Sequence, residues 1–127
     1  VLARSLARVG PLRRAAHRMG LEPEVRTFDA GTAVLLATAD VVVATTPAGA
    51  LDTLAAGLAE VRPGAVLLDV VYDPRPTPLM TAWRAAGGLA VGGERMLLHQ
   101  AGEQVRLMTG RVAPLAAMDA ALQDALG

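Results

Sequence analysis

The chain has 127 residues, enough for one domain with a single buried core, and its hydrophobic content of 53% excludes a disordered protein. It contains no cysteine and no lysine, which excludes disulfides, thiolate chemistry, cysteine-ligated zinc and lysine catalysis within this chain. The net charge is zero and every apolar run is short, so neither a nucleic acid nor a membrane is an expected partner.

Apolar periodicity and the positions of Pro and Gly predict alternating strands and helices. Pro11 suits the first turn of a helix and Gly20 its end, while Thr77 before Pro78 is typical of a helix start. In chain order we predict a strand end at 1–3, a helix at 11–19, an extended stretch at 24–28, a helix at 32–39, a strand at 40–44, a helix at 51–61, a strand at 65–71, a helix at 77–86, a strand at 89–91 and helices at 94–109 and 114–126.

This alternation predicts an α/β fold with a doubly wound parallel sheet, in one domain. Because aromatic residues are nearly absent, we expect the methionines at positions 80, 96, 108 and 118 to fill the core. The chain opens with Val rather than Met, inside an apolar stretch, so we interpret it as truncated at its amino terminus.

The first candidate site directly follows the predicted strand end at 1–3. In a dinucleotide-binding fold, an acidic residue at this place selects NAD, whereas an arginine and a small hydroxyl pair with the extra phosphate of NADP. Arg4, Ser5 and Arg8 stand here, and no acidic residue does. An arginine after a strand is also common as an ordinary surface residue, and both interpretations stay open at this point.

Three further stretches follow the later strands, at the edge where parallel sheets place their ligands. Residues 44–49 form a Pro-Gly turn that contains Thr46, and residues 69–79 form a proline-rich loop with the only tyrosine, Tyr72. Gly92 and Gly93 let the backbone approach a ligand closely, and Gln100 lies two turns into the helix that follows. Taken singly, the first pattern is also typical of a tight turn, the second of an amphipathic Tyr at a strand end, and the third of a solvated Gln.

Together, in this order and at these spacings, the four stretches resemble the shikimate dehydrogenase family. That family carries an Asn-Arg-Thr motif with a further basic residue, an Asn-x-Thr-x-x-Gly turn, an Asp-x-x-Tyr-x-Pro-x-x-Thr-Pro-Leu loop and a glycine-rich turn before Met-Leu-x-x-Gln. The matching residues, motif by motif, are Arg4, Ser5 and Arg8, then Thr46 and Gly49, then Asp69, Tyr72, Pro74, Thr77, Pro78 and Leu79, and finally Gly93, Met96, Leu97 and Gln100. The resemblance spans nearly the whole chain, and the third and fourth motifs are the specific ones.

The resemblance implies a cytoplasmic, NADP-dependent oxidoreductase that reduces 3-dehydroshikimate to shikimate in aromatic amino-acid biosynthesis. It implies that residues 1–127 form an incomplete Rossmann-like domain without its first strand and Gly-rich loop, and that a substrate domain with the catalytic Lys and Asp lies upstream. By resemblance, NADP would contact Arg4, Ser5 and Arg8 at its 2′-phosphate, Thr46 in the second motif, and Val70 and Gly93 at its nicotinamide end, while Tyr72 and Gln100 would contact the substrate. No catalytic or metal-ligating residue is expected in this chain, and alone it is expected to be inactive.

The sequence also departs from the family pattern. Ala3 and Ala44 stand where the family has Asn, and Glu94-Arg95 replace a more usual apolar-Gly pair. Two other functions stay open: an NAD-preferring quinate/shikimate dehydrogenase, which an acidic residue near positions 3–5 would have favoured, and a non-catalytic nucleotide-binding module. The oligomeric state is open as well, with a homodimer as one option.

Overall fold

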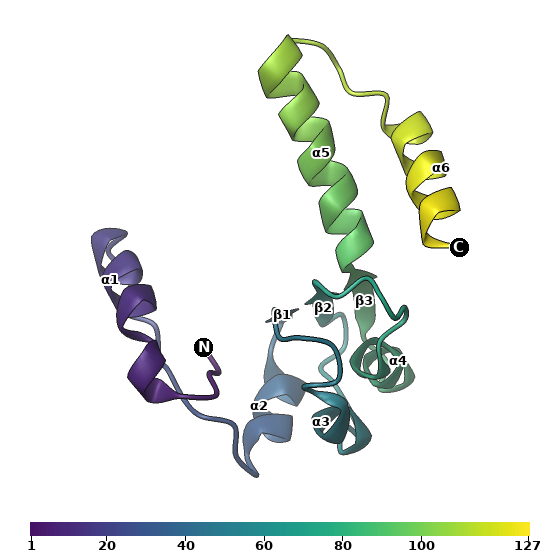
Figure 1. Ribbon diagram of the computed structural model, residues 1–127. Helices are drawn as coiled ribbons and strands as arrows, with labels where there is room; N and C mark the ends of the chain where they lie inside the picture. The colour runs from purple at the N-terminus through teal and green to yellow at the C-terminus, as the bar shows by residue number, and fades with distance from the viewer. The chain divides into compact units, whose positions relative to one another are not determined.

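The computed structural model describes all residues from Val1 to Gly127 and separates them into two units, Val1–Leu35 and Leu36–Gly127. The sequence predicts one domain for this range, with alternating strands and helices. The order of the elements agrees with the predicted alternation of strands and helices, and the elements of each unit can be followed by colour in Figure 1. None of the helices is both long enough and apolar enough to cross a membrane.

The first unit contains a short 3₁₀ turn, η1 (Leu6–Arg8), and the helix α1 (Gly10–Arg18). The predicted strand end and the extended stretch after α1 do meet, through a parallel bridge between Leu2 and Arg26. Two backbone hydrogen bonds of 2.9 Å, from Ala3 N–H to the Arg26 carbonyl and from Arg26 N–H to the Val1 carbonyl, support this bridge. The pairing stops there, so neither predicted segment forms a full strand.

The helix α2 (Thr32–Thr38) begins at a local polar cluster. The backbone N–H of Asp29 donates to the Thr32 hydroxyl at 2.9 Å, and the N–H of Gly31 donates to the Asp29 carboxylate at 2.9 Å. Thr32 is almost completely buried. These bonds satisfy backbone donors that the start of a helix would otherwise leave unpaired, which explains why the predicted helix begins at this residue.

Three parallel strands form the sheet of the second unit: β1 (Val41–Ala44), β2 (Val66–Asp69) and β3 (Leu89–Gly92). Their order is β1-β2-β3, with β2 in the centre. Ala44 pairs with Asp69 and Asp69 with Gly92, so the three strands end level with one another. The predicted α/β fold with a parallel sheet is therefore confirmed.

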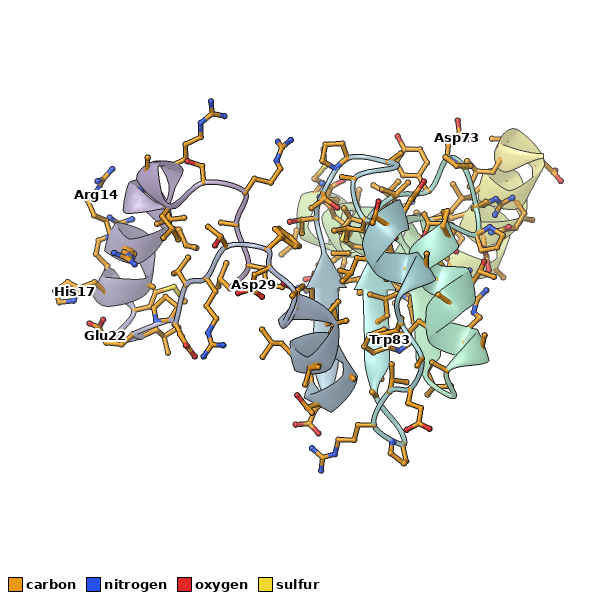
Figure 2. All side chains as sticks on the ribbon, turned by 90° about the horizontal axis from the view of Figure 1, so that it is seen from below. Arg14, His17, Glu22, Asp29, Asp73 and Trp83 are labelled. Carbon is orange, nitrogen blue, oxygen red and sulfur yellow. The ribbon has the colours of Figure 1, made fainter.

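Within the second unit, helices cover one face of this sheet and not the other. Leu67 of β2 is fully buried, as is Trp83 of α4 (Pro78–Ala85), whose indole N–H donates to the Ala65 carbonyl at 3.3 Å (Figure 2). On the opposite face, Val41 is 63% exposed and Leu89 is 62% exposed. A doubly wound sheet carries helices on both faces, so this apolar face is a feature that the sequence pattern alone did not predict.

The predicted helix at 51–61 is wrong in its length, because α3 covers only Asp52–Ala56. Gly57 caps the helix, and the residues beyond it form hydrogen bonds with other segments. The N–H of Val61 donates to the Ala86 carbonyl at 3.4 Å, and the N–H of Arg62 donates to the Ala37 carbonyl at 2.8 Å. These hydrogen bonds to distant segments take the place of the hydrogen bonds that a longer helix would form. The spacing of apolar residues in the sequence cannot reveal them.

Two antiparallel helices, α5 (Gly93–Thr109) and α6 (Leu115–Leu126), complete the second unit (Figure 1). Gly110 ends α5 in the left-handed conformation, with φ of 69°, as a C-terminal glycine does. Gly102 lets the two helices approach, since a Cβ there would lie 2.6 Å from a methyl group of Leu115. The boundaries predicted for both helices agree with the structure to within one residue.

The expectation that the methionines fill the core is only partly correct. Met80 on α4 is buried, whereas Met96 is 37% exposed and Met108 is 84% exposed. Met108 lies near the end of α5, beside the exposed Leu107. Helix α6 begins beside Gly102, so Leu107 and Met108 lie beyond the start of α6, toward the end of α5.

Candidate functional site

The candidate site lies at the carboxyl edge of the sheet, where the three strands end level. Thr46 follows β1, Val70 follows β2 and Gly93 follows β3. The N–H of Val70 donates to the Ala44 carbonyl at 3.0 Å, which continues the ladder past the end of both strands. Residues from all three loops therefore converge on the edge at which open parallel sheets bind ligands.

Two of the residues expected at the cofactor, Val70 and Gly93, are in direct contact. A Cβ added to Gly93 would lie 2.5 Å from the carbonyl carbon of Val70 and would overlap its oxygen. The N–H of Gly93 also donates to the carbonyl of Val71, at 3.4 Å. Only glycine allows α5 to begin this close to the loop after β2. Gly93 is buried in this contact, and Val70 is half-buried.

A buried polar pair fixes the base of the loop that carries Tyr72. The Thr77 hydroxyl donates to one Asp69 carboxylate oxygen at 2.7 Å, and the other oxygen accepts from the Val71 N–H at 3.2 Å. Thr77 also caps α4 by accepting from the Met80 N–H at 3.1 Å. Both residues matched the family motif, but their joint role was missed. An Asp at the end of an apolar strand, eight residues before a helix-capping Thr, was the available signal.

A small cavity of about 20 Å³ connects the first two loops of this edge. Thr46 and Gly49 of the turn after β1 line one side of it, and Asp69, Val71 and Thr77 line the other. The Thr46 turn and the Asp69–Thr77 pair are thus neighbours, as their places at the ends of adjacent strands require.

The two residues expected at the substrate both have free polar groups. Tyr72 is 45% exposed, and its phenol forms no hydrogen bond within the chain. Gln100 lies in the second turn of α5, exposed, and its amide forms none either. Both side chains can therefore meet a ligand without breaking an internal bond.

Glu94 and Arg95, where the sequence departs from the family, begin α5. The Glu94 carboxylate folds back over Gly92, so that a Cβ on Gly92 would lie 2.8 Å from its Cδ atom. One Glu94 oxygen is buried without a hydrogen-bond partner. Arg95 instead donates to the Asp119 carboxylate of α6 at 2.7 Å.

That ion pair belongs to a chain of polar contacts that sequence reasoning missed. Hydrogen bonds from Arg95 and from Gln123 hold the pKa of Asp119 below its ordinary value. The hydrogen bond and the charge of Asp119 in turn raise the pKa of the Arg95 guanidinium. Nothing in the local sequence relates α6 to Arg95, because the two partners are 24 positions apart.

The residues expected at the 2′-phosphate lie in the first unit. Arg4 and Arg8 are exposed and form no ion pair, and the half-buried Ser5 precedes η1. Arg13, Arg14 and Arg18 of α1 line an open cavity of about 630 Å³ together with His17, Glu22 and Pro23. Figure 2 labels Arg14, His17 and Glu22. His17 lies 3.4 Å from Glu22. Because Arg4 and Arg8 form no ion pair, their guanidinium groups are free to bind an anion.

No group of three or more acidic, histidine or cysteine side chains gathers to form a metal site. The polar groups at the carboxyl edge are a free phenol, a free amide and a buried carboxylate–hydroxyl pair. Such groups can bind and orient a ligand with hydroxyl, carboxylate or amide groups.

Comparison with known proteins shows which proteins this chain is similar to. The family model of the shikimate 5′-dehydrogenase C-terminal domain matches residues 93–123. A relative named shikimate dehydrogenase (NADP(+)) from Thermosynechococcus vestitus is 39% identical over 101 residues, which are 75% of this chain and 35% of that protein. Another with the same name, from Citrifermentans bemidjiense, is 36% identical over 121 residues, which are 94% of this chain and 41% of that protein.

A solved structure shows the same similarity. The shikimate dehydrogenase of Mycobacterium tuberculosis is 42% identical, with a TM-score of 0.79 over 95% of this chain and 46% of that chain. The present chain therefore spans less than half the length of each of these three proteins.

Proposed function

The chain belongs to the shikimate dehydrogenase family, and on this premise we propose that the protein containing it reduces 3-dehydroshikimate to shikimate with NADPH in aromatic amino-acid biosynthesis. In this proposal residues 1–127 supply part of the cofactor site and one side of the substrate site. The catalytic residues come from outside this range, since the chain has no lysine and its carboxyl edge carries no acid–base pair.

The observation that carries the proposal is the contact between Gly93 and Val70 at the level ends of β2 and β3. It brings the start of α5 against the loop after β2 at the carboxyl edge of a parallel sheet, which is the edge at which open sheets bind ligands. Thr46 lies on the neighbouring loop. These groups fit the nicotinamide end of a dinucleotide.

The cofactor supplies the hydride when it is bound, and the residues of this chain bind and orient. We assign Arg4, Ser5 and Arg8 to the 2′-phosphate, because unpaired guanidinium groups form charge-assisted bonds with phosphate oxygens. Thr46, Val70 and Gly93 position the nicotinamide end. Tyr72 and Gln100 hold hydroxyl or carboxylate groups of the substrate and so fix its ring relative to the hydride.

The test is a steady-state assay of the intact protein with 3-dehydroshikimate or shikimate, using NADPH/NADP and NADH/NAD in parallel. We expect turnover with the phosphorylated cofactor and a kcat/KM for NAD that is lower by at least about tenfold. Turnover with NAD and quinate instead would establish the alternative dehydrogenase. Dinucleotide binding without turnover of either substrate would establish a non-catalytic module.

Two further expectations belong to the same proposal. The intact protein is expected in the cytoplasm, where its cofactor and substrate are found, and a homodimer is the candidate assembly. Cell fractionation tests the first, and the molar mass from light scattering tests the second.

A further inference from the structure

Helix α6 carries two polar side chains one turn apart, Asp119 and Gln123, which bond to each other. Gln123 Nε2 donates to Asp119 Oδ1 at 3.1 Å. The same oxygen accepts from the Arg95 guanidinium of α5 at 2.7 Å, and Gln123 Oε1 accepts from the Arg75 guanidinium at 2.8 Å. All four side chains are half-buried. They form one continuous chain of hydrogen bonds from α5, through α6, to the loop after β2.

The loop between β2 and α4 has few other supports. Its two ends are fixed by the Asp69–Thr77 pair and by the Gly93 N–H, which donates to the Val71 carbonyl at 3.4 Å. Between these ends, the exposed side chains of Tyr72 and Asp73 form no hydrogen bond, and Arg75 bonds only to Gln123. The middle of the loop is therefore connected to the rest of the unit by a single side-chain hydrogen bond.

We propose that Gln123 is a positioning residue, which holds Arg75 and thereby keeps the loop in the conformation that presents Tyr72 to the substrate. The part that concerns the substrate rests on the proposed function, whereas the link between α6 and the loop does not. Gln123 touches neither cofactor nor substrate in this proposal. It acts through the backbone between Arg75 and Tyr72.

The chemistry of the amide explains why a glutamine suits this place. Asp119 accepts from the NH₂ group, which turns the carbonyl oxygen toward the guanidinium of Arg75. A carboxylate at position 123 would attract Arg75 but repel Asp119, and an apolar side chain would bond to neither. Asp119 is itself held by Arg95, so the amide is oriented by a fixed partner.

The first experiment measures hydrogen–deuterium exchange of the intact protein and needs no assumption about the reaction. Gln123→Met keeps the length of the side chain but removes both hydrogen bonds. We expect faster exchange at the amide of Val71, which donates to the Asp69 carboxylate at 3.2 Å, and at that of Gly93, which donates to the Val71 carbonyl at 3.4 Å. Arg75→Met should give the same increase, with no further increase in the double variant. Gln104→Met is the matched control, because Gln104 is exposed on α5 and forms no hydrogen bond. Unchanged exchange of the loop in Gln123→Met would overturn the proposal.

The second experiment uses kinetics to separate positioning from simple stabilisation. Gln123→Met should lower kcat/KM for shikimate by about tenfold, the equivalent of one hydrogen bond, and leave the KM for NADP unchanged. In a Tyr72→Phe background the same change should have little further effect, whereas its effect on thermal stability should stay the same. An additive loss in kcat/KM would show a merely structural role.

The two proposals fail in different ways. If Tyr72→Phe lowers kcat/KM and Gln123→Met does not, the positioning role is wrong and the proposed function stands. If the intact protein does not turn over shikimate at all, the proposed function is wrong, and the exchange of the loop amides still decides whether Gln123 holds the loop.

Discussion

Gly93 lies so close to Val70 that no other residue fits at the start of α5 without moving the loop after β2. Gly93→Ala should therefore destabilise the protein by about 1–3 kcal/mol, as overpacking of a close contact does. It should also raise the KM for NADP, because the displaced backbone is the proposed nicotinamide surface. Gly57→Ala is the control, since a Cβ there has only a 3.7 Å contact. Equal melting temperatures and equal KM values for the two variants would contradict the prediction.

Thr77 gives the second prediction, which concerns the base of the loop that carries Tyr72. Thr77→Ala removes the cap of α4 and leaves a buried carboxylate oxygen of Asp69 without its donor. We expect a loss of about 2–3 kcal/mol in the free energy of unfolding, measured with urea. Thr77→Ser keeps the hydroxyl and should retain most of the stability. A serine variant as unstable as the alanine variant would show that the lost methyl group, and not the hydrogen bonds, is responsible.

Sequence reasoning predicted the elements that depend on local signals. The apolar strand runs, the Thr77-Pro78 helix start and the Gly110 helix end each follow from the chemistry of a few neighbouring residues. The order of the three strands then brings Thr46, Val70 and Gly93 to one edge. The placement of these residues was predictable, because parallel strands end on the same side of a sheet.

What the sequence could not predict depends on long-range contacts. The helix at 51–61 is cut short by hydrogen bonds from Val61 and Arg62 to distant carbonyls. The link from Arg75 to Gln123 spans 48 positions and has no local pattern. The strand end at 1–3 has only one bridge, which apolar composition alone does not reveal. In each case the deciding partner lies far along the chain.

Arg4 carries the prediction on cofactor choice. In the intact protein, Arg4→Ala should weaken binding of NADP by about 1.5–3 kcal/mol, the contribution of a charge-assisted hydrogen bond, and change NAD binding little. Arg111→Ala is the matched control, because Arg111 is an exposed arginine without an ion pair. Isothermal titration with both cofactors measures the difference. Equal losses for NADP and NAD would refute the assignment to the 2′-phosphate.

Tyr72 and Gln100 carry the prediction on the substrate. Tyr72→Phe and Gln100→Ala each remove a polar group that forms no bond within the chain, so stability should be nearly unchanged. Each should lower kcat/KM for shikimate by about tenfold or more and leave the KM for NADP unaltered. Gln104→Ala, an equally exposed glutamine change on α5, should have no effect. If both variants keep the kcat/KM of the unmodified protein for shikimate, these residues do not contact the substrate.

The uncovered face of the sheet leads to the last prediction, which concerns residues 1–127 as a separate protein. Val41 and Val43 of β1 lie on this face with Leu89 of β3, and all three are more than half exposed. The outer edge of β1 also lacks a strand partner. Such surfaces favour association between copies, so the separate chain should elute as oligomers or aggregates and bind the hydrophobic dye ANS.

Replacing Val41, Val43 and Leu89 by Thr keeps a residue suited to strands but removes much of the apolar surface. We expect this triple variant to raise the monomer fraction and lower dye binding. Neither form should show dehydrogenase activity, because the range contains no G-x-G-x-x-G phosphate loop and no lysine. The prediction is wrong if the unmodified chain is a monomer, unfolds cooperatively on heating and binds NADP tightly. The sheet would then be stable with its apolar face in water.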